Sequence, residues 1–115
     1  MATSNIDKEQ FLNLIEGDKE LFITLLDLFK KDWPSLIEQL EKAMDSGQLN
    51  SVEQVSHRLK GNLRNFYAHQ AAEKAMSFEV AGRENDLGSV KGKVGELTLS
   101  IQAVEKDLEQ LLQTF

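Results

Sequence analysis

The sequence contains 115 residues, of which 19 are acidic and 13 are Lys or Arg, so its formal net charge is −6. This length predicts a single domain over residues 1–115, since domains most often contain about 100–150 residues, and the excess of acidic residues argues against a nucleic-acid-binding protein. The lack of cysteine excludes disulfide scaffolds, CxxC redox sites and thiolate zinc sites, while a polar start and the absence of any apolar run near ~18 residues indicate a cytoplasmic protein without a membrane segment.

Helical spacing of apolar residues occurs along almost the whole chain, and no segment shows the alternation that is typical of a strand. The first predicted helix is short: Asn5 or Asp7 would cap its start, and Gly17 would end it. The apolar residues expected on one face of this helix are Phe11, Leu14 and Ile15.

The second helical region covers residues 18–46 and begins at Asp18, a favourable capping residue. It carries a broad apolar face, as expected of a helix that faces the core of a bundle. The residues of this face are Leu21, Phe22, Leu25, Leu26, Leu28, Phe29, Leu36, Ile37, Leu40 and Met44. Pro34 interrupts the pattern, and because proline kinks a helix beyond its first turn, the sequence leaves open whether this region is one bent helix or two abutting ones.

Two further helices are predicted in the middle of the chain. The first begins at residues 50–51, which have the composition of a helix start, and runs to about Ala68. Residues 69–70 would form a tight corner before the next helix, over about residues 71–81. Residues 82–86, Gly-Arg-Glu-Asn-Asp, have the composition of a turn.

The final predicted helix begins near Leu87, and the glycines in its first turns indicate either close helix packing or a frayed start. Its apolar stripe is typical of a core-facing helix. The residues of the stripe are Leu97, Ile101, Val104, Leu108 and Leu111. Short connections between amphipathic helices predict an all-α, up-and-down four-helix bundle with a short N-terminal capping helix.

The helix predicted to start at residues 50–51 has an unusual polar face. At about 100° per residue its apolar residues share one side, and His57 points away from them, toward solvent. The apolar residues are Val52, Val55, Leu59, Leu63 and Phe66. Four residues lie within about 60° of His57 on the same wheel. They are Glu53, Lys60, Gly61 and Arg64.

Each of these residues alone has an ordinary explanation as a solvated surface side chain. Gly61 is the exception, because a helix glycine costs stability and no core packing would need it on a polar face. A bare glycine beside an exposed histidine indicates that a large partner approaches the imidazole. Neutral imidazole is a competent nucleophile, and Lys60 could balance the charge of an anion on the ring. The combination predicts a site that carries a phosphoryl group.

The segment His57-Arg58-Leu59-Lys60-Gly61 resembles the H-x-L-K-G signature of histidine-containing phosphotransfer (HPt) domains of two-component phosphorelays. Those domains are four-helix bundles with the phospho-accepting histidine exposed midway along a helix. Phe78-Glu79 resembles the Leu-Glu pair that the family has on the next helix, and the order and length of the helices match over the whole chain.

The resemblance implies a role for each matching residue. His57 would be phosphorylated, Lys60 would balance the phosphate charge, and Gly61 would give clearance to a docking partner. Glu79 would orient the imidazole, although a surface salt bridge or a cap is an equally good explanation for it. Residues assigned to partner docking are Glu53, Arg58 and Arg64.

Two positions depart from the family pattern. Asn62 follows the glycine where small residues are favoured, and Tyr67 replaces a glycine that is frequent at that point. Neither change removes the His, Lys or Gly of the motif, so the chemistry is expected to be unaffected. The sequence leaves open how the end of this helix packs.

The resulting hypothesis is a phosphoprotein that reversibly carries a phosphoryl group on His57 between receiver-domain aspartates, without kinase activity of its own. We expect no cofactor and no metal, since Mg²⁺ would belong to the receiver. The expected partners are response-regulator receiver domains and a hybrid sensor histidine kinase, with the chain itself a monomer. Two alternatives stay open: a helical adaptor that binds receivers without being phosphorylated, and the phospho-accepting domain of a chemotaxis-type kinase.

Overall fold

The structure is a computed structural model that describes residues 5–115, so residues 1–4 of the predicted domain lie outside the described part. The described chain is helical and contains no strand. Its elements are α1 (Lys8–Ile15), α2 (Lys19–Ser46), α3 (Leu49–Asn65), α4 (His69–Arg83), the 3₁₀ helix η1 (Leu87–Val90) and α5 (Val94–Gln113). No helix in residues 5–115 is long and apolar enough to cross a membrane.

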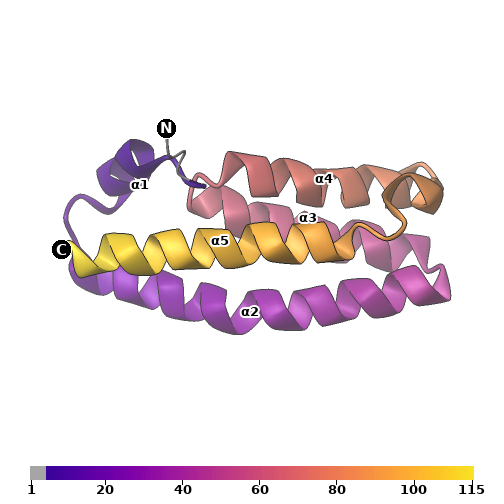
Figure 1. Cartoon of the computed structure of the whole chain (residues 1–115), viewed down its shortest axis with the longest axis horizontal. Coiled ribbons are helices and arrows are strands. Elements are labelled where there is room, and N and C mark those ends of the chain that lie inside the picture. The colour runs from indigo at the N-terminus through magenta and orange to yellow at the C-terminus, as the bar shows by residue number, and fades with distance from the viewer. Residues whose placement is uncertain (1–4) are drawn as a thin grey trace.

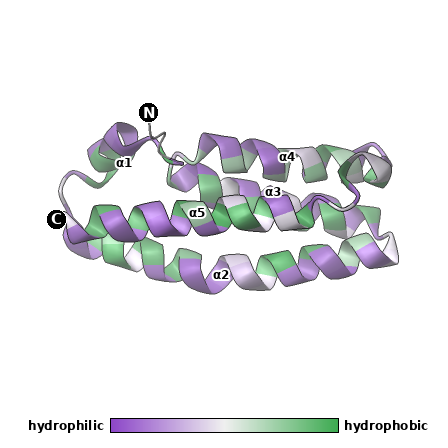
Figure 2. Ribbon diagram, viewed as in Figure 1, coloured by the Kyte–Doolittle hydropathy of each residue, from purple (hydrophilic) through white to green (hydrophobic). Residues whose placement is uncertain are grey.

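Four long helices form the predicted up-and-down bundle, which confirms the fold class (Figure 1). Helix α2 packs against α3 and α5, and α4 packs against the same two helices from the other side. Apolar and polar residues alternate along every helix in Figure 2, as expected where each helix turns one stripe to a shared core.

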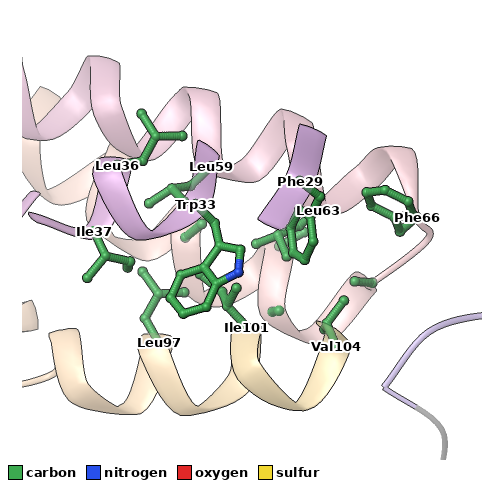
Figure 3. Packing of buried hydrophobic residues seen from close by; sticks show 14 of the residues in the cluster. Phe29, Trp33, Leu36, Ile37, Leu59, Leu63, Phe66, Leu97, Ile101 and Val104 are labelled. Atoms are coloured by element: carbon green, nitrogen blue, oxygen red, sulfur yellow. The ribbon is translucent and has the colours of Figure 1, made fainter. Parts of the chain in front are cut away.

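The core of the bundle is built from the apolar stripes that the periodicity predicts. The stripe of α5 is buried along its whole length, from Leu97 to Leu111. Trp33 of α2 is buried and points toward Leu97 and Ile101 of α5 (Figure 3). Its indole Nε1 donates a hydrogen bond of 2.9 Å to Glu105, so the polar end of this large side chain is satisfied at the edge of the core.

Helix α1 caps one end of the bundle. Asp7 begins the helix by accepting a hydrogen bond from the backbone N–H of Gln10, at 3.1 Å. The Phe11 ring lies 4.9 Å from that of Phe22 and 5.4 Å from that of Phe66, which fixes α1 against α2 and α3. Leu14 is 52% exposed. Its predicted place on the buried face is therefore wrong, because a helix of only two turns presents a narrow stripe to the bundle.

Residues 19–46 form one continuous helix, α2, in which Pro34 is tolerated. The proline lacks the N–H that would bond the carbonyl of Lys30. Both residues are exposed, so the proline lies on the solvent side of the helix, away from the core. The buried face is narrower than predicted, since Leu21 and Leu28 are 39% and 53% exposed.

Helix α3 ends at Asn65, three residues before the predicted end at Ala68. Tyr67 adopts a left-handed conformation with φ 56°, which stops the helix. Glycine would enter this conformation without strain, whereas a tyrosine adopts it at an energetic cost. The Tyr67 carbonyl accepts a hydrogen bond of 3.0 Å from the backbone N–H of Asp7, so the corner also anchors the start of α1.

The predicted turn at residues 82–86 and the predicted start of the last helix both need correction. Helix α4 begins at His69 rather than after a corner at residues 69–70, and it continues to Arg83, so Gly82 is helical. The last helix begins at Val94 rather than near Leu87, because Gly92 has φ +77° and separates η1 from α5.

Candidate functional site

His57 lies in the middle of α3 on the side that faces away from the core. Its side chain is 65% exposed, while the predicted apolar residues of the same helix are buried. The exposure predicted from helical spacing is confirmed. His69, the other histidine of the chain, is the first residue of α4 and is also exposed.

A buried carboxylate holds the His57 ring. Glu79 reaches it from α4, and its Oε2 lies 2.9 Å from His57 Nδ1, although only 6% of the Glu79 side chain is exposed. An ionised carboxylate only accepts hydrogen bonds, so the proton of the ring belongs on Nδ1. The neutral ring then has its lone pair on Nε2. The structure brings Glu79 into contact with the imidazole, and its side chain is buried there rather than exposed on the surface.

Lys60 also turns toward Glu79. Its ammonium lies 2.6 Å from Glu79 Oε1, and only 11% of its side chain is exposed. On the helix wheel Lys60 lies on the side of His57, but its side chain crosses to α4 and buries its stem between the two helices. Burial alone would raise the pKa of Glu79, but the neighbouring Lys60 and His57 outweigh it and hold this pKa below its ordinary value. Glu79 is therefore ionised at neutral pH.

Arg83 is a fourth member of this cluster that sequence reasoning missed. One guanidinium nitrogen donates to Glu79 Oε2 at 3.1 Å, and Nε donates to Glu53 Oε2, also at 3.1 Å. Glu53, assigned to partner docking, is thus tied to α4. The spacing of four residues between Glu79 and Arg83 favours an ion pair on one helix face and is the signal that could have revealed it.

Gly61 is exposed, and a Cβ placed on it would meet nothing within 4 Å. Packing within the described chain therefore does not require a glycine there. Arg58 and Arg64 are exposed on the same helix as expected. Residues 5–115 contain no cluster of three or more His, Asp or Glu side chains that could hold a metal ion.

One known protein family matches most of the chain. The profile of the Hpt domain matches residues 24–114, which includes α3, α4 and every residue of the site. The chain belongs to the Hpt domain family. Hpt domains act in two-component phosphorelays, where they interact with receiver domains, so phosphotransfer in a phosphorelay is the function of this Hpt domain.

A solved structure agrees with this assignment at the level of the fold. The Hpt domain is similar to histidine-containing phosphotransfer protein B (HptB) from Pseudomonas aeruginosa PAO1, with a TM-score of 0.88 and 20% sequence identity. The similarity covers 99% of each chain. A comparison with curated proteins gave no match.

Proposed function

We propose that His57 is the phospho-accepting residue of this Hpt domain and that it carries the phosphoryl group reversibly between receiver-domain aspartates. The observation that carries the proposal is the 2.9 Å contact between His57 Nδ1 and the buried Glu79. It leaves Nε2 of an exposed ring as the nucleophilic atom, on a residue that matches the histidine of the family signature.

In the forward step the Nε2 lone pair attacks the phosphorus of a receiver aspartyl phosphate. The Nε2–P bond forms, the bond from phosphorus to the aspartate oxygen breaks, and that oxygen keeps the electron pair as a carboxylate. The Nδ1 proton stays in place, so the phosphorylated ring is cationic, and the adjacent Glu79 carboxylate stabilises this charge. The return step is the reverse, which allows transfer in either direction.

The protein's contribution is positioning and charge, as in phosphoryl transfer generally. Mg²⁺ would come from the receiver, and the Hpt domain would need no cofactor and no kinase activity of its own. The predicted role of Lys60 as a counter-ion for the phosphoryl group stays a proposal. Its contact with Glu79 supports a second task, which is to keep that buried carboxylate ionised.

Partner docking is proposed for the surface around His57. Gly61 would give the receiver clearance, and exposed Arg58 and Arg64 would face the acidic site of the receiver, since complementary charge favours fast and selective association. Glu53 sits at the border of this surface. We further propose a monomeric, cytoplasmic domain charged by a hybrid sensor histidine kinase.

The test is to incubate the Hpt domain with a phosphorylated receiver and to follow the label. Transfer to the wild type and to His69→Gln, and none to His57→Gln, is the expected result, with a product that is labile in acid and stable in alkali. Equal labelling of His57→Gln would overturn the proposal. Receiver binding without any labelling would favour the adaptor, and labelling only with ATP and a kinase would favour the chemotaxis-type domain.

A further inference from the structure

We propose that Arg58, assisted by Gln54, binds the phosphoryl group that His57 carries. Arg58 would then belong to the transfer site as well as to the surface on which the receiver docks. This inference rests on the proposed function, because it concerns the phosphorylated form of His57, and it adds a second cation to the charge balance expected of Lys60.

An open hollow lies beside the His57 ring. Its volume is about 530 Å³, and its lining residues are Glu53, Gln54, His57, Arg58 and Glu79. Side chains of an α-helix lean toward its N-terminus, so those of His57 and Arg58 both lean toward the turn that carries Gln54. A group bonded to the ring therefore has room in this hollow, next to Gln54 and Arg58.

The two ring nitrogens of His57 face different surroundings. Nδ1 faces the Glu79 carboxylate at 2.9 Å. Lys60 and Arg83 both pair with this same carboxylate. Because the outward directions of Nδ1 and Nε2 diverge across the imidazole ring, a phosphoryl group on Nε2 points away from the carboxylate. Both cations are thus engaged on the Nδ1 side of the ring, and a further counter-charge can approach from the Nε2 side.

Arg58 is available to supply that charge. Its side chain is exposed and makes no hydrogen bond or ion pair with any other residue in 5–115, and the same is true of the Gln54 side chain. The two residues are four apart, so they are neighbours on one face of α3. A guanidinium can donate two parallel hydrogen bonds to phosphoryl oxygens, and the amide of a glutamine can donate another. Neither side chain would give up an existing contact in order to bind.

Arg64 differs from Arg58 in its place along α3. It is also exposed and without an ion pair in the described part of the chain, but it does not line the hollow. It follows His57 by seven residues, which is about 10 Å along the helix axis, and the His57 ring leans away from it. Arg64 can therefore meet a docked receiver without reaching the phosphoryl group, which makes it the matched control.

The experiment measures how the phosphoryl group distributes between the Hpt domain and a receiver at equilibrium. The full chain is mixed with a labelled, phosphorylated receiver at concentrations at which both proteins are mostly free, and the two labelled forms are quantified once their ratio is constant. The distribution constant depends only on the free energies of the separate proteins with and without the phosphoryl group. It therefore reports contacts to that group, and it does not report contacts made only in the docked complex.

Arg58→Gln is expected to shift the distribution toward the receiver by about three- to fivefold, the size expected for an exposed charge pair. Arg58→Lys keeps the charge but not the paired donors, so its distribution should lie between those of the wild type and Arg58→Gln. Gln54→Ala should give a smaller shift in the same direction. Arg64→Gln should slow transfer through weaker docking and leave the distribution unchanged.

A wild-type distribution in Arg58→Gln, or an equal shift in Arg64→Gln, would overturn the proposal. Failure of the proposed function is a separate result, because the wild type itself would then take no label on His57. A labelled wild type whose distribution does not respond to Arg58→Gln contradicts only the assignment of Arg58 to the phosphoryl group.

Discussion

Two glycines of the α3–α4 pair stand in opposite environments. At Gly82 a Cβ would lie 2.8 Å from backbone atoms of α3, whereas at Gly61 it would meet no atom of the described chain within 4 Å. Both pay the conformational cost of a glycine inside a helix. The first is explained by the fold, because it lets the helices approach and brings Arg83 to Glu53. The second has no explanation within residues 5–115, which supports the proposed clearance for a partner that approaches His57.

The variant Gly82→Ala tests whether the close approach of α3 and α4 requires a glycine. The added methyl group must push α3 and α4 apart, and overpacking of this kind costs about 1–3 kcal/mol, more than alanine returns in helix propensity. We expect the free energy of unfolding to fall by about 2 kcal/mol in urea denaturation. A variant as stable as the wild type would show that the two helices do not need the glycine.

The effect of Gly61→Ala should be smaller in stability and opposite in sign. Alanine is favoured over glycine in a helix interior, so the free energy of unfolding should rise by about 0.5–1 kcal/mol. Transfer from a phosphorylated receiver should slow by about tenfold, because small misplacement of reacting groups is costly.

Gly95→Ala is the matched control for this change. Gly95 is also exposed, lies within a helix and has no atom within 4 Å of a Cβ, but it is in α5. Because Gly95 lies in the first turn of α5, this variant should gain somewhat less stability than Gly61→Ala, and it should transfer at the wild-type rate. If Gly61→Ala also transferred at the wild-type rate, the partner-clearance role of Gly61 would be wrong.

The sequence was sufficient to predict the bundle and the exposure of His57, because both follow from the period of the helix within single segments. The sequence predicted the ends of the helices less accurately. Gly82 has the composition of a turn, yet it lies inside α4, at the point where the backbone of α3 comes close. The end of α3 depends on Tyr67 adopting a left-handed conformation, which a propensity for tyrosine does not predict.

In the site, too, features within one helix could be predicted, whereas contacts between helices could not. His57 and Gly61 could be placed from one helix wheel, since their surroundings are solvent. Lys60 could not, because its side chain turns to a carboxylate on another helix, and the helix wheel contains no information on α4. The bridge from Arg83 to Glu53 also joins two helices, so only the structure reveals it.

In the proposed mechanism His57 presents Nε2, and not Nδ1, to the phosphoryl group. The most direct test is to phosphorylate the full chain from a receiver and to identify the bonded nitrogen by NMR coupling between phosphorus and the ring. We expect a single phosphoryl group on Nε2 of His57, with the proton retained on Nδ1. A bond to Nδ1, which faces Glu79 at 2.9 Å, or to any other residue would contradict it.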